Sequence, residues 1–190
     1  MNRETWLDSA VQRLRPVFDA AGHPLPEVVK VACGFPSRSA LAQSKRRIGE
    51  CWYPEHSKDK TTTNVLISPT LDDAVRVLDV LVHECIHAAV GPGVGHKGPF
   101  RKLAKRLGLE GKMTATVAGP ELAKSLGVLA GQLGAYPHAS LDYSKVKKQG
   151  TRMLKATCPD CGYVIRGTRQ WFDKGLPVCV CGGQFEEQSV

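Results

Sequence analysis

The chain has 190 residues, of which 42% are hydrophobic and 23% charged, values that fit a folded globular protein and exclude a disordered or fibrous one. No stretch reaches the roughly 18 apolar residues of a membrane span, and charged residues interrupt the first twenty positions, so no signal peptide is expected. We therefore predict a cytoplasmic protein with no membrane partner, in which clustered cysteines indicate metal binding rather than disulfides.

The net charge of +8 is concentrated in one part of the chain. Residues 1–96 contain 11 basic and 11 acidic residues, whereas residues 97–174 contain 15 basic and 5 acidic residues, a net charge of +10. Localised positive charge attracts polyanions, nucleic acid first among them. The sequence thus favours DNA as a partner, single-stranded or duplex; a solvated basic surface that keeps the protein soluble is the alternative.

The first third of the chain predicts one helix followed by strands. Apolar residues recur at helical spacing over residues 3–20, and the Gly/Pro-containing stretch after them ends the helix. Short apolar runs separated by turn-like segments then predict three strands, at residues 27–33, 48–53 and 63–68.

A longer helix is expected from Leu71 to Val90, with Thr70 as its N-cap and the Gly-Pro-Gly cluster from Gly91 ending it. At 100° per residue its apolar side chains share one arc, while His83 and His87 project from another side. The helix can therefore pack into a core and present two imidazoles to a cleft.

The rest of the chain divides into three parts. Two more helices are expected at residues 98–108 and 120–130, the first of them basic and amphipathic. Residues 131–153 lack periodicity and predict a basic linker, and the composition then changes to a cysteine-bearing module. We predict a first domain over 1–130, a linker over 131–153 and a zinc ribbon over 154–190.

Residues 83–87 read His-Glu-Cys-Ile-His. Histidines at positions i and i+4 of a helix lie one above the other and can bind one zinc ion. Zinc lowers the pKa of a bound water to near 7, and Glu84 between the histidines can accept its proton as general base. The pattern predicts a hydrolytic zinc centre; two surface histidines are the alternative, and Cys85 is expected to be a buried thiol.

A catalytic zinc needs a third protein ligand and one open position. His96 is the leading candidate, because it follows a Gly-Pro-Gly-Val-Gly turn that is flexible enough to fold back on the helix. A glutamate from a later element, Glu110 or Glu121, is the rival.

Four cysteines cluster near the C-terminus. Two pairs separated by 17 residues are typical of a four-cysteine structural zinc site, and the intervening YVIRGTRQWF predicts a hairpin. The second pair is a C-x-C rather than a C-x-x-C, which makes Cys179 the least secure ligand. The predicted ligands of this second zinc ion are Cys158, Cys161, Cys179 and Cys181.

Nucleic-acid contacts are expected from the basic helix and from the ribbon. A cation can bind a phosphate backbone while an aromatic ring beside it stacks on an unpaired base. The alternative is that Trp171 fills the small core of the ribbon. The candidate residues are Arg101, Lys102, Lys105, Arg166, Arg169 and Trp171.

HECIH, then GHKGPF, then a C-terminal cysteine ribbon, in this order, resemble the SprT-like metallopeptidase family, which includes the Spartan proteases. The resemblance covers about residues 5–185. It implies a zincin-like α+β fold, a small mixed sheet packed with helices, with zinc on His83, His87 and His96 and Glu84 as base. It also implies a protease that cleaves DNA-associated proteins. The short interval between His87 and His96 departs from the family pattern, as do the lysine after His96 and the compressed second knuckle.

Three functions stay open on the residues alone. The first is a zinc-dependent endopeptidase whose substrates are proteins bound to nucleic acid. The second is a zinc-stabilised nucleic-acid-binding or transcription-associated protein with little or no peptidase activity. The third is a zinc hydrolase of a non-peptide amide. The substrate sequence and the oligomeric state have no signature in the sequence.

Overall fold

The computed structural model describes residues 1–145 and 153–188, and it divides the chain into two compact units, Met1–Ser144 and Lys145–Val190. Part of the predicted linker, residues 146–152, lies outside the described residues. Among the described residues, no helix has the length and apolar character needed to cross a membrane.

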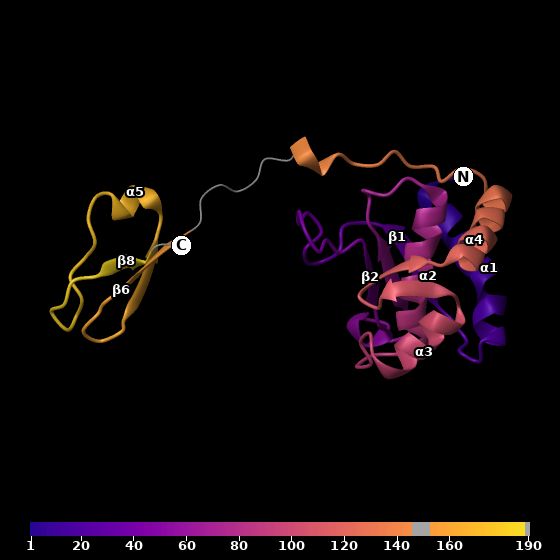
Figure 1. Cartoon of the computed structure of the whole chain (residues 1–190), viewed down its shortest axis with the longest axis horizontal. Coiled ribbons are helices and arrows are strands. Elements are labelled where there is room, and N and C mark those ends of the chain that lie inside the picture. Colours follow the sequence, from indigo (N-terminus) through magenta and orange to yellow (C-terminus); the bar gives the residue numbers. More distant parts are fainter. Residues whose placement is uncertain (146–152, 189–190) are drawn as a thin grey trace. The chain divides into compact units, whose positions relative to one another are not determined.

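A three-stranded mixed sheet forms one layer of the first unit (Figure 1). The central strand β3 (Thr63–Ile67) pairs in parallel with β1 (Val29–Cys33) and antiparallel with β2 (Gly49–Trp52). The small mixed sheet and its helices confirm the predicted α+β class. The 3-10 turn Pro54–His56 follows β2.

Helices α1 (Arg3–Ala20) and α2 (Ala74–Val90) pack against this sheet, and α4 (Pro120–Leu133) packs against these two helices. Helix α2 contacts β2 and β3 as well as α4, and Figure 1 shows it between the strands and α4. Burying each large apolar side chain contributes about 1.5–3 kcal/mol. The fully buried side chains at the centre of this core include Trp6, Phe18, Leu78, Leu81 and Ile86.

Helix α2 begins three residues later than predicted. Its N-cap is Asp73, whose Oδ1 accepts a hydrogen bond from the Arg76 amide at 2.7 Å. The Thr70 hydroxyl instead pairs with the Ser68 hydroxyl at 3.0 Å. Residues 68–71 form a turn, in which the Leu71 amide donates to the Ser68 carbonyl at 3.2 Å, and the helix begins after it.

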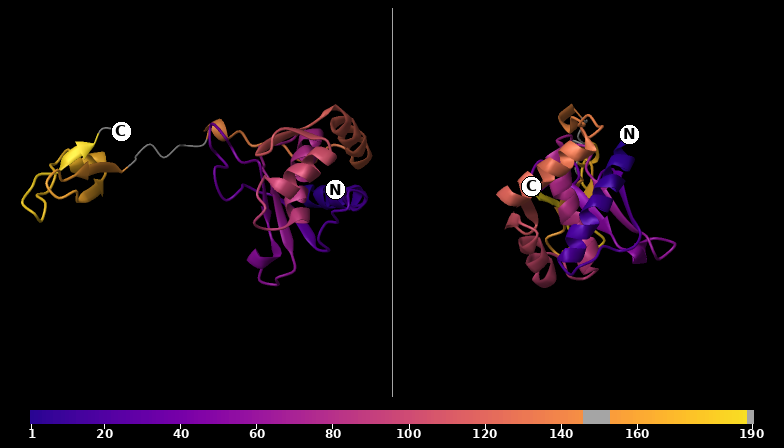
Figure 2. Two further views of the ribbon diagram at one scale, coloured as in Figure 1. Left: turned by 60° about the horizontal axis from the view of Figure 1, so that its bottom comes forward. Right: turned by 90° about the vertical axis from the view of Figure 1, so that its right-hand side faces the viewer.

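A β-hairpin that the sequence did not predict follows α3 (Gly98–Arg106). Strands β4 (Leu109–Lys112) and β5 (Ala115–Ala118) pair antiparallel, and Figure 2 shows α3 beside them. Only one residue of each strand is buried, Leu109 and Thr116, so no apolar alternation marks them in the sequence.

The first unit also extends beyond the predicted boundary at residue 130. Helix α4 continues to Leu133, and the Tyr136 ring then packs edge-on against Trp6 at 5.0 Å. The Ser140 hydroxyl donates a hydrogen bond to Asp72 at 2.6 Å. These contacts attach residues 134–140 to the first unit, and a 3-10 turn, Tyr143–Lys145, follows them in the chain.

The second unit is a small antiparallel sheet with strand order β7-β6-β8. Its elements are β6 (Leu154–Thr157), β7 (Val164–Gly167), the one-turn helix α5 (Arg169–Phe172) and β8 (Glu186–Gln188). The hairpin predicted within YVIRGTRQWF is therefore wrong: its first half pairs with β6 instead, and its second half is helical.

Candidate active site and metal centres

Three imidazoles meet at one point of the first unit. His83 and His87 lie one turn apart on α2, and His96 reaches them from the turn before α3. The Nε2 atom of His96 lies 3.1 Å from Nε2 of His83 and 3.1 Å from Nε2 of His87. The structure thus brings together all three histidines that the sequence singled out.

The spacing of these nitrogens fits a zinc ion. Tetrahedral zinc with Zn–N bonds of about 2.0–2.1 Å separates two ligand nitrogens by about 3.3 Å. The donor atoms of the three histidines all lie within 4.8 Å of one another. Three imidazoles leave one tetrahedral position for water or substrate, as a catalytic centre requires.

The second ring nitrogen of His83 has a buried partner. His83 Nδ1 lies 2.8 Å from the hydroxyl of Thr116, which is only 5% exposed on β5. This hydrogen bond leaves Nε2 as the nitrogen that can bind metal, because a ligand histidine is oriented by the bond its other nitrogen makes. Phe100, fully buried, packs against all three imidazoles, with ring centroids 4.4–5.0 Å away.

Burial keeps the three imidazoles neutral. Desolvation, aided by repulsion from His96 and Arg76, lowers the pKa of His83 to about 4. Desolvation is also the main cause that lowers the pKa of His87 to about 3, and it lowers the pKa of His96. Neutral imidazole is the form that binds metal, so the site is prepared for an ion at neutral pH.

Glu84 lies against the backbone of β2. A Cβ atom placed on Gly49 would come within 2.4 Å of Glu84 Oε1, so only glycine fits at this point of the strand. The carboxylate forms no hydrogen bond with a described residue. Its burial raises the pKa of Glu84 to about 8, an effect that Arg47 opposes and Glu50 reinforces. A metal cation nearby would favour the ionised form, in which Glu84 can accept a proton.

Arg47 is a positively charged residue close enough to this site to affect its titrating groups. Its guanidinium donates a 2.6 Å hydrogen bond to Glu50. Its charge opposes the rise in the pKa of Glu84 and adds to the lowering of the pKa of His87 and His96 by burial. Glu50 is only 8% exposed, and it also accepts hydrogen bonds from the amide and hydroxyl of Ser37 and from the Trp52 indole. Despite its burial, these donors lower the pKa of Glu50, so it remains a carboxylate that holds Arg47 in place.

The rival ligands lie outside the histidine group. Neither Glu110 nor Glu121 belongs to the cluster of possible metal ligands among the described residues. The Glu110 carboxylate instead lies against Gly119, where an added Cβ would be 2.6 Å from Oε1. Cys85 is fully buried, as expected for a thiol in the core, and burial raises its pKa to about 12.

The four cysteine sulfurs form a second cluster. Cys158 Sγ lies 3.5 Å from Cys181 Sγ, and Cys161 Sγ lies 3.5 Å from Cys179 Sγ; all four lie within 4.8 Å of one another. Zinc bound to four thiolates at about 2.3 Å separates the sulfurs by about 3.8 Å, so the cluster fits one ion with no open position.

The shortened second cysteine pair, Cys179 and Cys181, still places both sulfurs in the cluster. A turn closes it, with the Cys179 amide donating to the Gly183 carbonyl at 2.8 Å. Gly182 in this turn has φ +91°, and a Cβ on Gly183 would come within 2.8 Å of Cys158 Sγ. The two glycines that follow Cys181 thus let a C-x-C spacing serve where C-x-x-C is usual.

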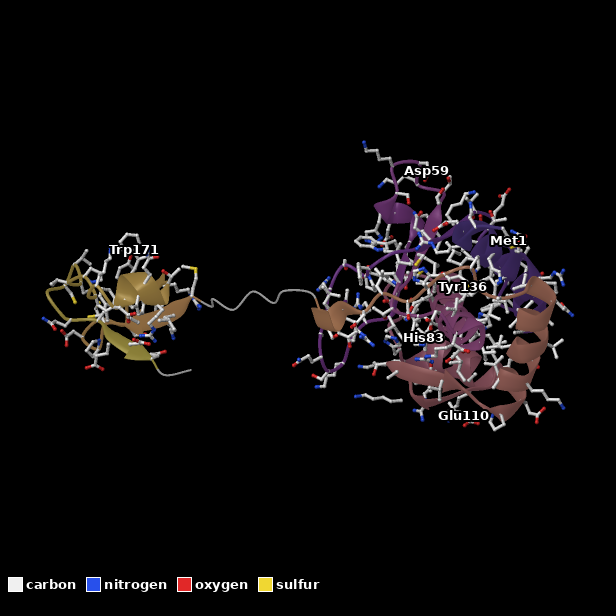
Figure 3. All side chains as sticks on the ribbon, turned by 90° about the horizontal axis from the view of Figure 1, so that it is seen from above. Met1, Asp59, His83, Glu110, Tyr136 and Trp171 are labelled. Atoms are coloured by element: carbon white, nitrogen blue, oxygen red, sulfur yellow. The ribbon has the colours of Figure 1, made fainter. Side chains whose placement is uncertain are left out.

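The residues predicted to contact nucleic acid differ from one another in exposure and in the partners that they contact. Arg101 and Lys105 line one groove together with His96, whereas Lys102 is exposed outside that lining. Trp171 is 60% exposed on α5 (Figure 3), with the Lys174 amine 4.7 Å from its ring centroid, so it does not fill the ribbon core. Arg169 is bound to Glu187 by hydrogen bonds of 2.6 and 3.0 Å, while Arg166 is exposed.

Four residues that shape the histidine site were not predicted from the sequence. Thr116, Gly49 and Glu50 come from strands far from His83 in the chain, and no motif marks them. Phe100 did carry a signal, because it is the apolar residue of GHKGPF, three positions into the helix that follows His96.

Comparison with known proteins gives no relative from which a role could be transferred. No protein-family model, no curated protein and no solved structure matches the chain. A function therefore has to be inferred from the chemistry of the two clusters themselves.

Proposed function

We propose that the chain is a zinc-dependent metalloendopeptidase of the SprT-like type that acts on DNA-associated proteins. The observation that carries the proposal is the meeting of three neutral imidazoles, with the His96 Nε2 atom 3.1 Å from each of the other two, beside the buried carboxylate of Glu84. A zinc ion held by His83, His87 and His96 would polarise a substrate carbonyl and make water acidic enough to lose a proton near pH 7.

The residues around the imidazoles have separate roles in this mechanism. Glu84 accepts a proton from the attacking water and passes it to the departing amine as the C–N bond breaks. Thr116 fixes the orientation of the His83 ring, and Phe100 excludes solvent from the inner side of the three rings. Arg47, held by Glu50, supplies positive charge that stabilises the oxygen on which negative charge develops.

An extended peptide is the substrate that this site suits best. Strand β2 is an edge strand, and β3 covers only one of its two edges. On the other edge its backbone makes no hydrogen bond with the described residues. A peptide can pair with such an edge as an added strand, which would carry its backbone past Glu84, since Glu84 touches Gly49 of β2. This favours peptide hydrolysis over the hydrolysis of a small amide.

Features of the second unit support the association with DNA. A closed four-thiolate site gives a small domain a stable fold without leaving a position for catalysis. On its surface an exposed tryptophan lies under a lysine amine, and Arg166 is exposed as well. Bases of single-stranded nucleic acid stack on such rings while cations bind the backbone.

The Glu84→Gln substitution tests the proposal against the second candidate, a zinc-stabilised nucleic-acid-binding protein without peptidase activity. Glutamine keeps the shape of the side chain but cannot accept the proton, so we expect cleavage of a protein substrate to fall about 10²–10⁴-fold with zinc content unchanged. A zinc-loaded wild type that cleaves no protein would favour the second candidate. Cleavage that persists in Glu84→Gln would show that Glu84 is not the base.

The substrate class has a separate test. We expect a DNA-binding protein to be cleaved faster when single-stranded DNA is present, because the ribbon would hold enzyme and substrate on one strand. Equal rates with and without DNA would remove DNA from the proposal and leave the peptidase intact.

A further inference from the structure

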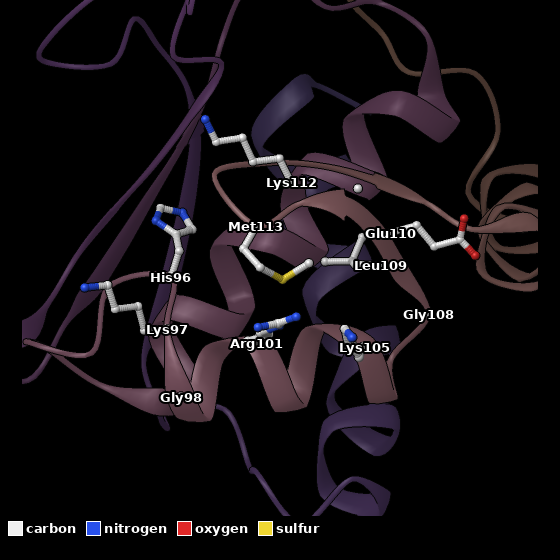
Figure 4. A pocket seen from close by; sticks show the side chains of 11 residues that line it. His96, Lys97, Gly98, Arg101, Lys105, Gly108, Leu109, Glu110, Lys112 and Met113 are labelled. Atoms are coloured by element: carbon white, nitrogen blue, oxygen red, sulfur yellow. The ribbon is translucent and has the colours of Figure 1, made fainter.

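A basic groove begins at the histidine site and runs between α3 and the β4–β5 hairpin (Figure 4). Its volume is about 720 Å³, and His96 belongs to its lining. Leu109 and Met113 contribute apolar surface between the two walls. Four cationic side chains make the groove basic: Lys97, Arg101, Lys105 and Lys112.

These four cations have no acidic partner among the described residues. Glu110 is the one acidic residue of the lining, and Figure 4 shows its carboxylate pointing away from the groove. That carboxylate lies against Gly119 instead. Four positive charges around one concave surface, without a compensating acid, create a field that attracts an anionic ligand.

The spacing of the cations suits an extended peptide. Arg101 and Lys105 are four residues apart on α3, which separates them by about 6 Å along the helix axis. Alternate side chains of an extended chain point the same way and are about 6.6 Å apart. Two acidic side chains at positions i and i+2 of a peptide can therefore face Arg101 and Lys105 together.

The position of the groove identifies its occupant. A peptide whose scissile carbonyl lies at the imidazoles must leave the site on some path, and this groove starts at one of those imidazoles. A nucleic-acid strand in the same groove would obstruct that path. Resting on the proposed peptidase function, we infer that the groove is a specificity subsite that selects substrates with acidic residues at alternate positions on one side of the scissile bond.

Mapping of cleavage sites tests the inference directly. The zinc-loaded full chain is incubated with a random-sequence peptide library, and the cut positions are read by mass spectrometry. We expect Asp and Glu to be enriched at two alternate positions on one side of the cut. Cleavage with no acidic enrichment on either side would overturn the inference while leaving the peptidase proposal in place.

Binding gives a readout that does not need turnover. Zinc-loaded Glu84→Gln is titrated with a fluorescent peptide carrying two alternate acidic residues, and with the same peptide carrying Gln at those positions. Exposed ion pairs are individually weak, so we expect the acidic peptide to bind about fivefold more tightly at low salt, with the ratio falling at a salt concentration of about 1 M. An equal affinity for both peptides would contradict the inference.

A pair of charge reversals locates the effect. Lys105→Glu, made in the Glu84→Gln chain, should abolish the preference for the acidic peptide. Lys124→Glu, the same change at an exposed position of α4 outside the groove, should leave it unchanged. If Lys105→Glu weakens binding of a single-stranded oligonucleotide and leaves the peptide ratio unchanged, the groove is a nucleic-acid site and the inference fails. If the preference holds in binding but the wild type cuts no peptide, the peptidase proposal fails and the groove stands only as a binding site for acidic peptides.

Discussion

The two clusters of possible metal ligands in this chain would surround an ion in different ways. The cysteine cluster offers four thiolates and closes the coordination sphere, and its unit has a small core that includes two of those cysteines. The histidine centre offers three imidazoles, leaves one position open, and lies on a large core that includes Trp6, Phe18 and Phe100. On our proposal, an ion in the cysteine cluster would stabilise the fold of its unit, whereas an ion in the histidine centre would supply chemistry.

Cys158→Ser should give the largest effect. The hydrophobic core of the second unit consists only of Ala156, Cys158, Cys179 and Phe185 among the described residues. We therefore expect its fold to depend on zinc, whose binding contributes about 10–16 kcal/mol in comparable small domains. We expect the amide signals of residues 153–188 to collapse in NMR spectra while those of the first unit stay dispersed. His83→Ala is the control, and it should leave the ribbon signals in place. A ribbon that stays folded in Cys158→Ser would end the distinction between the centres.

Glu84→Gln should change how the stability of the metal-free protein depends on pH. The pKa of Glu84 is about 8 in the fold, against 4.5 as the ordinary value, so the folded state holds a proton that the unfolded state loses between these pH values. The contribution of Glu84 to the free energy of unfolding therefore falls as pH rises from 4.5 to 8. Glutamine removes this loss. In urea unfolding with EDTA, Glu84→Gln should gain stability over the wild type at about pH 8 relative to about pH 5.

One outcome of the urea experiment would contradict the raised pKa of Glu84. The neutral imidazoles also bind protons below pH 6.5 on unfolding, but they do so in both proteins and cancel in the difference. The same stability difference at both pH values would mean that Glu84 is ionised in the metal-free fold, and that burial does not control it.

Thr116→Val should weaken zinc binding at the histidine centre alone. Valine keeps the volume of the side chain but removes the hydroxyl 2.8 Å from His83 Nδ1. Loss of such a partner costs about 10–100-fold in metal affinity. Competition with a chromophoric chelator should show one of the two zinc ions released more easily. Thr114→Val, at an exposed position between β4 and β5, is the matched control and should release zinc as the wild type does.

Arg169→Gln should have the smallest effect. Its ion pair with Glu187 is exposed, and such pairs contribute little to stability. We expect thermal unfolding of the zinc-loaded chain to be unchanged, because zinc and not the pair holds the second unit together. A clear drop in the melting temperature would show that polar contacts contribute to holding it together.

Parts of this picture could be predicted from the sequence because they are local. The i, i+4 spacing of His83 and His87 fixes their relative position on any helix, and the glycine-rich turn allowed His96 to return to them. The cysteine spacing likewise identified all four sulfurs that cluster. In each case the information lies within a few residues of chain, or in a pattern that is typical of metal binding.

The remaining features depend on contacts across the fold. Thr116 meets His83 from 33 residues away, on a strand too short to show alternation. No motif marks Glu50 or Arg47, and Glu50 owes its place beside the site to the hydrogen bonds that it accepts from Ser37 and Trp52. The sequence therefore predicted which histidines and cysteines cluster better than it predicted the residues that orient them.

Zinc content, measured by mass spectrometry of the metal, is the most direct test of two independent centres. We predict two zinc ions per wild-type chain and one in His87→Ala, with the remaining ion lost when Cys161→Ser is added. One ion in the wild type would mean that only one of the two clusters holds zinc, and two ions in His87→Ala would mean that binding does not depend on His87. Either result would contradict the account.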